Sequence, residues 1–261
     1  MSPERLGQHF LNDPIWQERI ADAVSVDHGL WVEIGAGHGE MTSRLAQRAG
    51  KVIAIELDRR LAAHLRKSTS ANGNVEVVQG DVLVVDFGAL TQGHQFLVYG
   101  NLPYYITSPI LHRLFEHAER LAAIHIVIQY EVALRIAASP GCRDYGYLSV
   151  VSQWFSRPEI EFKIPPDAFN PPPKVDSALI TLRTPGENAR SKVGDEKQFF
   201  EFVKECFAQK RKTLRNNLRN RLGTRTEDML RETGLPSGVR AEELSVAQFA
   251  TLFALAQAKD F

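Results

Sequence analysis

The sequence predicts an α/β fold with a mainly parallel sheet, followed by a small all-helical domain. Two observations lead to this prediction. Short β-branched apolar runs alternate with helical patterns through the first two-thirds of the 261 residues, which is the rhythm of βαβ units with helices on both faces of a sheet. From Phe199 onward, apolar residues recur at helical spacing, with breaks at Gly223 and at residues 234–238.

Five apolar runs are expected to form the parallel strands, and they lie at residues 30–34, 52–57, 75–79, 96–100 and 124–129. Three further runs follow one another without an intervening helical pattern, at residues 147–155, 159–164 and 178–183. Because strands in direct succession can pair antiparallel, we expect these three runs to add an antiparallel edge to the sheet.

The connecting segments suggest where the domains divide. Residues 165–173 are rich in proline, and because each proline ring fixes its own φ, we expect a stiff loop there. Residues 184–197 mix glycine, proline and charged side chains, which is typical of a linker. We therefore expect a first domain over residues 1–185, with an N-terminal arm at 1–29, and a helical domain over residues 198–261.

The composition argues against several classes of protein. No stretch approaches the roughly 20 uninterrupted apolar residues of a membrane helix, and the N-terminal segment carries Glu4, Arg5 and His9 in place of an apolar signal core. A cytoplasmic protein without a membrane partner is expected. Cys142 and Cys206 are the only cysteines, and the eight histidines are scattered, so neither a disulfide framework nor a metal site is expected.

Charge is balanced overall but unevenly distributed. Lys and Arg number 31, as do Asp and Glu, so the net charge is zero. Residues 208–225 contain no acidic side chain, and their basic residues are Lys210, Arg211, Lys212, Arg215, Arg219, Arg221 and Arg225. An expected helix over residues 208–222 places an apolar stripe beside this cluster. A solvated charged face is the alternative, but the absence of acids favours RNA binding through Lys210, Arg211, Lys212, Arg215 and Arg219.

The first predicted strand runs into a glycine-rich loop, GAGHG, at residues 35–39. Such a loop lets the backbone approach a ligand at the carboxyl end of the strand, where a doubly wound sheet has its binding crevice. The dinucleotide fingerprint requires glycine three positions beyond Gly37, where Glu40 stands instead. A glutamate at the start of the next helix disfavours a pyrophosphate. A phosphate-free nucleoside is therefore expected, and a nicotinamide oxidoreductase is disfavoured.

Acidic residues follow at the ends of the next two strands. Glu56 lies 21 positions after Gly35, where a carboxylate can accept hydrogen bonds from both ribose hydroxyls of a nucleoside. Asp81 can accept a hydrogen bond from an adenine amino group, with Val82 as an apolar wall. A tight turn followed by two strand-end caps is the alternative. The glycine loop, Glu56 and Asp81 follow three successive predicted strands, which favours a nucleoside site. The implied ligand is S-adenosyl-L-methionine.

The fourth strand ends in the motif NLPY, from Asn101 to Tyr104. A purine amine is a poor nucleophile because its lone pair is delocalised, so an enzyme that alkylates it has to orient it. The side-chain carbonyl of Asn101 and the backbone carbonyl of Leu102 can accept hydrogen bonds from its two N–H groups, while Tyr104 stacks on the base. A proline turn with a buried tyrosine is the simpler alternative. Phe169, in the stiff loop, is either a loop anchor or a cover for an extracted base.

Together these residues resemble the bacterial small-subunit rRNA adenine dimethyltransferases, which convert two adjacent adenines in the 3′-terminal hairpin of 16S rRNA to N6,N6-dimethyladenine. The resemblance covers nearly the whole chain, through the segments GQHFL (7–11), EIGAG (33–37), 52–58, 80–81, NLPY (101–104), FNPPPKVDS (169–177) and 209–218. It implies a Rossmann-like S-adenosylmethionine-dependent methyltransferase domain. It also implies that the substrate is 16S rRNA in an immature small ribosomal subunit, with a role in subunit biogenesis.

The resemblance also implies roles for single residues. His9 and Leu11 would contact the methionine end of the cofactor, and the loop with Gly35 would contact the cofactor through its backbone. Glu56 would bind the ribose and Asp81 the adenine, while Asn101 would contact both cofactor and target amine. The family usually has asparagine at the position of His9. Because imidazole side chains change charge near neutral pH, cofactor affinity is expected to depend on pH.

Two other functions remain open at this stage. The related large-subunit rRNA methyltransferases confer macrolide resistance, but agreement in the C-terminal domain favours the small subunit. The chain could instead act mainly as a ribosome assembly factor, with methylation secondary. Glu56, Asp81 and Asn101 favour an enzyme.

Overall fold

The computed structural model describes residues 9–24, 28–103, 105–186 and 193–258. The chain divides into two compact units. The first comprises Met1–Ala133 and Arg157–Pro185, and the second comprises Leu134–Ser156 and Gly186–Phe261. Among the described residues, no helix is long and apolar enough to cross a membrane.

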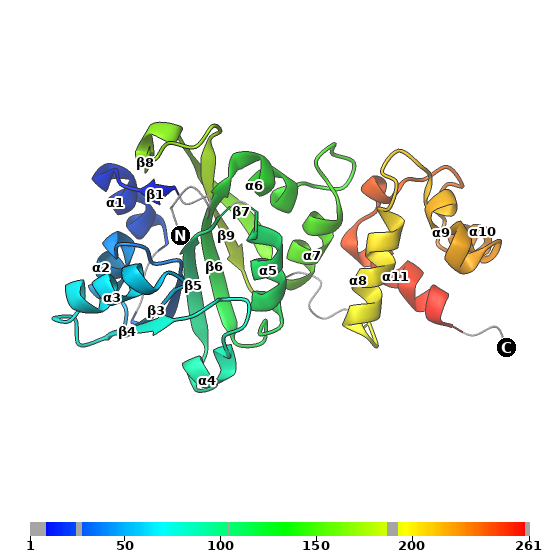
Figure 1. Cartoon of the computed structure of the whole chain (residues 1–261). Helices are drawn as coiled ribbons and strands as arrows, with labels where there is room; N and C mark the ends of the chain where they lie inside the picture. Colours follow the sequence, from blue (N-terminus) through cyan, green and yellow to red (C-terminus); the bar gives the residue numbers. More distant parts are fainter. Residues whose placement is uncertain (1–8, 25–27, 104, 187–192, 259–261) are drawn as a thin grey trace. The chain divides into compact units, whose positions relative to one another are not determined.

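The first unit is built on a sheet whose strand order, within the described residues, is β4-β3-β2-β5-β6-β9-β7 (Figure 1). The parallel strands are β2 (Leu30–Ile34), β3 (Lys51–Glu56), β4 (Val75–Gln79), β5 (Phe96–Asn101) and β6 (Leu121–Gln129). An antiparallel edge follows, with β9 (Ser177–Arg183) beside β6 and β7 (Arg157–Ile164) beside β9. The predicted parallel strands are confirmed, and two of the three runs predicted for the antiparallel edge, 159–164 and 178–183, are strands.

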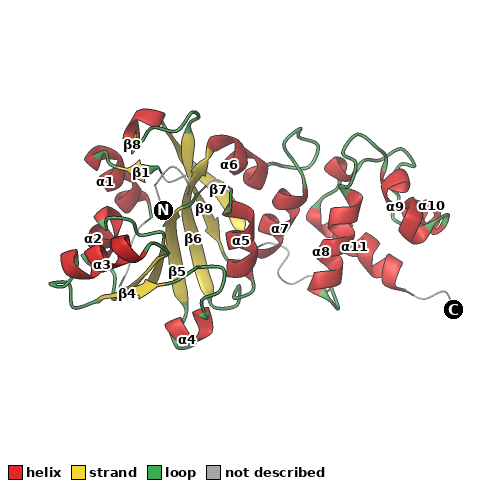
Figure 2. Ribbon diagram, in the orientation of Figure 1, coloured by secondary structure: helices red, strands yellow, loops and turns green. Residues whose placement is uncertain are grey.

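Helices cover both faces of this sheet (Figure 2). One side carries α1 (Pro14–Ala23), α2 (Glu40–Ala46) and α3 (Arg59–Ser68), and the other carries α5 (Thr107–Phe115). The short helix α4 (Phe87–Thr91) lies between β4 and β5. Strands β2 and β3 are buried along almost their whole length, as expected for a sheet covered on both faces. Because β2 and β3 run parallel, their carboxyl ends lie at the same edge of the sheet.

The proline-rich segment is more regular than the sequence indicates. It contains a 3-10 turn at Pro166–Ala168 and a two-residue strand, β8 (Phe169–Asn170). This strand pairs antiparallel with β1 (Phe10–Leu11), so the N-terminal arm and the predicted loop form one ribbon. Strands of two residues leave no periodic signal, which is why the sequence did not predict the pairing.

The prediction of a strand over residues 147–155 is wrong, because this segment is the helix α7 (Tyr147–Phe155). None of its side chains is exposed, and Val150, Val151 and Trp154 are buried. Because no residue of the helix is exposed, it has no solvated polar face, and the 3.6-residue alternation that identifies surface helices is weak in its sequence. Its β-branched and aromatic residues then favour a strand.

The second unit is helical and is formed by two separate stretches of the chain. Its helices include α7, α8 (Glu196–Cys206), α9 (Leu214–Leu222), α10 (Arg225–Glu232), α11 (Val246–Gln257) and a 3-10 turn at Ala241–Glu243, while α6 (Tyr130–Ala137) begins in the first unit and ends in this one. Tyr145, Val150 and Trp154 share one hydrophobic cluster with Phe199 and Phe202. The unit is therefore larger than the domain at 198–261 that the sequence indicates.

Candidate functional site

A glycine-rich loop joins β2 to α2 at the carboxyl edge of the sheet. Gly35, Gly37 and Gly39 have positive φ values of 72°, 58° and 95°, which glycine adopts far more readily than other residues. Packing adds a second requirement, since a Cβ at Gly37 would stand 3.1 Å from the Phe10 ring and one at Gly39 only 2.5 Å from Leu65 Cδ1. The loop thus presents bare backbone at the edge where the sequence predicts a crevice.

Glu56 ends β3 and is buried, with 2% of its surface exposed. Its Oε2 accepts a hydrogen bond from the Gly37 amide, and its Oε1 accepts one from the Asp58 amide, both at 2.9 Å. Each oxygen is therefore held by one backbone donor and keeps a further lone pair. Two adjacent hydroxyl groups of one ligand can bind at two acceptors fixed in this way.

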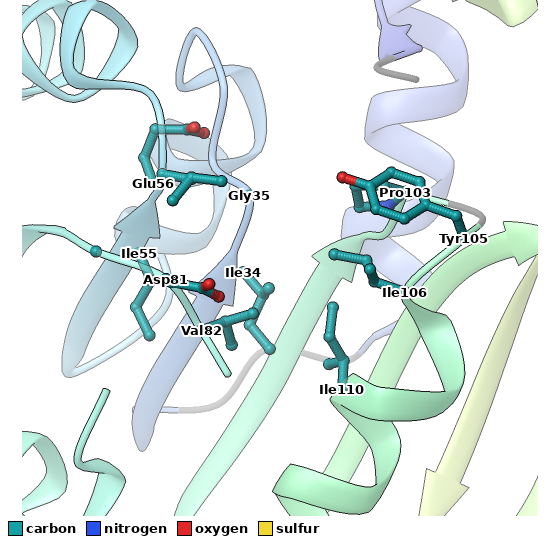
Figure 3. A pocket seen from close by; sticks show the side chains of 12 residues that line it. Ile34, Gly35, Ile55, Glu56, Asp81, Val82, Pro103, Tyr105, Ile106 and Ile110 are labelled. Carbon is teal, nitrogen blue, oxygen red and sulfur yellow. The ribbon is translucent and has the colours of Figure 1, made fainter. Parts of the chain in front are cut away.

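A cavity of about 510 Å³ opens beside Glu56 (Figure 3). Its lining residues are Ile34, Gly35, Ile55, Glu56, Leu57, Gly80, Asp81, Val82, Pro103, Tyr105, Ile106 and Ile110. Figure 3 shows Asp81 and Val82 on one side of the cavity and Tyr105 and Ile106 on the other. Asp81 Oδ1 accepts a hydrogen bond from the Leu83 amide at 2.9 Å, which fixes the carboxylate at the wall. An apolar slot with carboxylates along one side suits a flat, hydrogen-bonding ring joined to a sugar.

A second cavity, of about 360 Å³, lies on the other side of the glycine loop. Its lining residues are Phe10, Leu11, Glu33, Gly35, Ala36, Gly37, Glu40, Met41, Tyr99 and Asn101. Gly35 lines both cavities, so the loop separates one from the other. A single elongated ligand laid across the loop would reach both.

Two buried polar side chains line the second cavity. Glu33 and Tyr99 occupy paired positions on β2 and β5 and are 2% and 1% exposed. Within the described residues, neither Glu33 Oε2 nor the Tyr99 hydroxyl has a hydrogen-bond partner. Burial raises the pKa of Glu33 to about 8, with a hydrogen bond from Thr42 acting against the rise and the charges of Glu40 and Glu56 adding to it. Unsatisfied buried polar atoms are costly, and a polar ligand in this cavity would give the Glu33 and Tyr99 oxygens a partner.

Asn101 ends β5 and lines the second cavity. Its Nδ2 donates a hydrogen bond to the backbone carbonyl of His9 at 2.8 Å. This contact orients the amide, with Oδ1 as its acceptor. His9 is held in turn by the proline-rich segment, because its Nδ1 donates to the Pro171 carbonyl at 2.7 Å. The β1–β8 ribbon therefore positions the Asn101 side chain.

The structure places the other predicted residues as follows. Leu11 lines the second cavity, and Leu102 buries its side chain, at 2% exposure, beside the end of β5. Phe169 pairs with Leu11 and is 4% exposed within the hydrophobic cluster on the α1–α2 side of the sheet. Its burial agrees with the loop-anchor interpretation, and its role as a cover for an extracted base stays a prediction. Tyr104 lies outside the described residues.

The predicted basic helix begins later than expected. Helix α9 starts at Leu214, where Thr213 caps it, so Lys210, Arg211 and Lys212 lie in the preceding loop. Three of the cations in this basic segment are already paired. Arg215 contacts Glu227 at 2.7 Å, Arg221 contacts Glu205 at 3.2 Å and Lys210 contacts Glu242 at 3.9 Å. Among the described residues, no acidic side chain lies within 4 Å of Arg211, Lys212 or Arg219, and all three are exposed.

Sequence reasoning missed the Glu33–Tyr99 pair and the wall formed by Tyr105, Ile106 and Ile110. Glu33 had one visible signal, because it is a charged residue inside an otherwise apolar strand, LWVEI. The wall at the start of α5 gave none, because apolar residues at such a position pack into the core as often as they line a pocket. In the described part of the chain, no group of three or more His, Cys, Asp or Glu side chains could hold a metal ion.

Comparison with known proteins adds independent observations. The family model described as ribosomal RNA adenine dimethylase matches residues 3–258. Two relatives named ribosomal RNA small subunit methyltransferase A match 95% of the chain: that of Acidobacterium capsulatum is 44% identical over 89% of its own length, and that of Xanthomonas campestris pv. campestris is 43% identical over 93%.

Two solved structures are also similar. A dimethyladenosine transferase from Plasmodium falciparum superposes with a TM-score of 0.82 at 26% identity, covering 94% of this chain and 96% of that one. The 23S rRNA methyltransferase ErmE gives a TM-score of 0.72 at 29% identity, covering 95% of this chain and 100% of that one. Both similarities extend over the sheet and the helical region alike.

Proposed function

The chain belongs to the ribosomal RNA adenine dimethylase family and is therefore an rRNA adenine dimethyltransferase, and we propose that its substrate is 16S rRNA. The proposed reaction is dimethylation of N6 on two adjacent adenines in the 3′-terminal hairpin. Relatives that are 41–44% identical over 95% of the chain carry a small-subunit name, which supports this substrate. We further propose that the target is presented by an immature small subunit in the cytoplasm.

The proposed methyl donor is S-adenosyl-L-methionine, as expected from family membership. Glu56 would accept hydrogen bonds from the ribose, and Asp81 and Val82 would hold the adenine in the larger cavity. The methionine end would lie in the second cavity with His9, Leu11, Gly35 and Gly37. Two observations support this fit. The loop carries no side chain where the ligand crosses, and Glu33 and Tyr99 leave polar atoms without partners among the described residues. The bound cofactor supplies an electrophilic methyl group on a sulfonium.

The observation that carries the proposal is the orientation of Asn101. Its amide nitrogen is engaged by the His9 carbonyl, so Oδ1 is the acceptor available to an adenine N–H. The Leu102 backbone carbonyl is the proposed acceptor for the second N–H, and Tyr104 the proposed stacking surface. Accepting both hydrogen bonds fixes the plane of the amine and turns its nitrogen toward the methyl donor. Alignment of this kind can supply much of the rate, and no strong base is needed because the proton leaves after transfer.

Two transfers on one nitrogen place different demands on these acceptors. The unmodified amine has two N–H groups, whereas the monomethylated amine has one. Asn101 Oδ1 alone is then enough to orient the amine for the second transfer, provided that the amine rotates about its bond to the ring and points its remaining N–H group toward Oδ1. We therefore propose that Asn101 serves both steps and that the Leu102 carbonyl serves the first.

A large-subunit substrate is the second candidate, and one observation favours it. The fold of ErmE, named as a 23S rRNA methyltransferase, is matched over its full length. Identity to ErmE is 29%, however, against 44% for the small-subunit relative from Acidobacterium capsulatum. A role as an assembly factor with secondary methylation is a third candidate, and the fixed carboxylate of Glu56 argues for an enzyme.

One experiment separates these candidates. The protein is incubated with labelled S-adenosyl-L-methionine and, in parallel, with immature small subunits, mature small subunits and large subunits, and the modified nucleotides are mapped. Dimethyladenine at two adjacent positions near the 3′ end of 16S rRNA, formed on immature small subunits, is the expected result. Label only in 23S rRNA would select the second candidate, and tight particle binding without label the third.

A further inference from the structure

Helix α3 carries four cationic side chains and no acidic one. They are Arg59, Arg60, Arg66 and Lys67, and all are exposed. At 100° per residue these four fall within an arc of about 120° on the helix surface. Ala62 and Leu65 lie outside the arc and are fully buried. The helix therefore turns one apolar side to the sheet and one strongly positive side to the solvent.

The positive side of α3 is not neutralised by the protein. Among the described residues, no carboxylate lies within 4 Å of Arg59, Arg60 or Lys67, and Arg66 donates only to the Val77 backbone carbonyl at 3.3 Å. Other solvated helices pair their charges internally, as Lys204 with Glu201 in α8 and Arg231 with Asp228 in α10 do. An ordinary solvated face mixes signs in this way, whereas α3 does not.

Arg66 and Lys67 lie in the last turn of α3, where cations stabilise a helix, but the first turn carries cations as well. Arg59 and Arg60 occupy its first turn, where the partial positive charge of the helix amino terminus disfavours cations. Asp58 offsets part of this cost by capping the amides of Arg60 and Leu61 at 2.7 and 3.1 Å. Two arginines at the unfavourable end are better explained by an anionic partner than by helix stability.

The helix also has a defined place relative to the site. It begins three residues after Glu56, and its Leu65 side chain packs against Gly39 of the glycine loop. The His64 ring lies 6.2 Å from the His38 ring of the same loop. The first turn of α3, with Arg59 and Arg60, thus lies at the carboxyl edge of the sheet, the edge at which Asn101 ends β5, and the basic face runs from there along the helix to Arg66 and Lys67.

We propose that the face formed by Arg59, Arg60, Arg66 and Lys67 binds phosphates of the RNA strand that flanks the target adenine. This inference rests on the proposed function, because a polynucleotide whose base reaches Asn101 has to carry its backbone along the same edge. Lys and Arg bind phosphate oxygens without reading sequence, so this face fixes position and not base identity. An anionic membrane is the competing partner, but α3 exposes no large apolar side chain to insert into one.

The test compares two triple variants with the same change in charge. Arg59→Gln, Arg60→Gln and Lys67→Gln remove the unpaired cations, and glutamine keeps a good helix propensity. Lys51→Gln, Arg120→Gln and Arg157→Gln are the control, because these cations lie at the opposite edge, at the start of β3, before β6 and at the start of β7. Among the described residues, only Lys51 of these three has a carboxylate within 4 Å, that of Glu76. Arg66 is kept because of its bond to Val77.

Binding to small ribosomal subunits is measured at several salt concentrations for the parent and both variants. The α3 variant should lower the slope of log K against log salt by ~0.7–0.9 for each phosphate that it no longer binds, while the control keeps the parent slope. Affinity for S-adenosyl-L-methionine should match the parent in both variants. Equal slopes in all three proteins would overturn the inference. Binding to vesicles of anionic lipid is measured in parallel, and an α3 variant that loses only vesicle binding would overturn it as well. If the parent itself fails to methylate 16S rRNA, the proposed function fails instead.

Discussion

The side-chain amide of Asn101 donates to the backbone carbonyl of His9 across 2.8 Å, joining the end of a core strand to the N-terminal arm. The contact uses a backbone acceptor, so it does not depend on the identity of the residue at position 9. It leaves Asn101 Oδ1 as the acceptor for an incoming N–H group. Orientation of the catalytic amide is therefore a property of the ribbon and the strand together.

Asn101→Ala should lower the single-turnover rate of methylation by a factor of ~10² or more, because it removes an acceptor that aligns the amine. Binding to small subunits should stay nearly intact. His9→Ala should lower the rate less than Asn101→Ala, because it keeps the backbone carbonyl that holds Asn101 and removes the ring's hydrogen bond to Pro171 and its proposed contact with the cofactor. Asn101→Asp should fall between the two, because it keeps acceptor oxygens and removes the donor. Parent-like rates in a folded Asn101→Ala protein would contradict the mechanism.

Glu56→Ala should weaken binding of S-adenosyl-L-methionine by about 1.5–3 kcal/mol, the scale of hydrogen bonds to a charged group. Glu56→Gln should also bind less well, because its amide N–H₂ would oppose the amide of Gly37 or that of Asp58. Calorimetry measures both affinities, and thermal unfolding checks that each variant is folded. An unchanged affinity in either folded variant would remove Glu56 from the proposed ribose site.

The stability of the protein should fall as pH rises from about 6.5 to 8. Glu33 has its pKa raised by burial to about 8, so the native state keeps a proton there that the unfolded state has already released. The unfolded state binds fewer protons in this window, and stability then decreases by up to about 1.4 kcal/mol per pH unit. Urea unfolding at several pH values measures this slope.

Glu33→Gln should flatten the slope, whereas Glu119→Gln, at an exposed position of the same unit, should leave it unchanged. His125, whose pKa burial lowers to about 4, acts in the opposite sense. It makes stability rise with pH until the unfolded histidine has released its proton, about one pH unit above 6.5, and the comparison of the parent with Glu33→Gln removes this shared contribution. A slope in Glu33→Gln equal to that of the parent would show that Glu33 is not the group responsible.

In the basic segment, the pairing of each cation should decide its contribution to rRNA binding. Arg211→Gln, Lys212→Gln and Arg219→Gln together should reduce the salt dependence of binding to small subunits by ~0.7–0.9 for each phosphate no longer bound. The triple change of Lys210, Arg215 and Arg221 to Gln should have a smaller effect, because these cations are paired with Glu242, Glu227 and Glu205. A larger effect of the Lys210, Arg215 and Arg221 variant than of the other triple variant would mean that the ion pairs open when rRNA binds.

A fragment covering residues 198–261 should not fold by itself. It lacks Tyr145, Val150 and Trp154, which are buried in the same cluster as Phe199 and Phe202. Removal of large core side chains typically costs several kcal/mol each, more than a small helical unit can lose. Circular dichroism should show little helix and no cooperative transition, and a cooperative transition would contradict this view of the unit.

Much of the first unit could be predicted because its signals are local. Each parallel strand is a short apolar run, and Gly35, Glu56 and Asp81 stand at consecutive strand ends, where chain order alone brings them to one edge. The helix α7 was missed for the opposite reason, since a helix without an exposed residue has little of the polar and apolar alternation on which recognition depends.

The rest of the site depends on contacts between residues far apart in the sequence. The bond that orients Asn101 spans 92 positions, and the bond from His9 to Pro171 spans 162. The ion pairs that neutralise Arg215 and Arg221 also join residues distant in the sequence. Counting the basic residues of the segment therefore overestimates how many of them carry an unpaired charge. No local pattern contains this information.

The ribbon of β1 and β8 can form only late in the synthesis of the chain, because its two strands are far apart in the sequence. Phe10 and Leu11 emerge from the ribosome first, but their partners, Asn170 and Phe169, are translated after all the parallel strands. Until then the His9 carbonyl has no fixed position from which to orient Asn101, and the second cavity lacks one wall. A nascent chain that has not reached Asn170 can form the parallel strands, but it lacks the ribbon that, in the proposed mechanism, positions Asn101 for the target base.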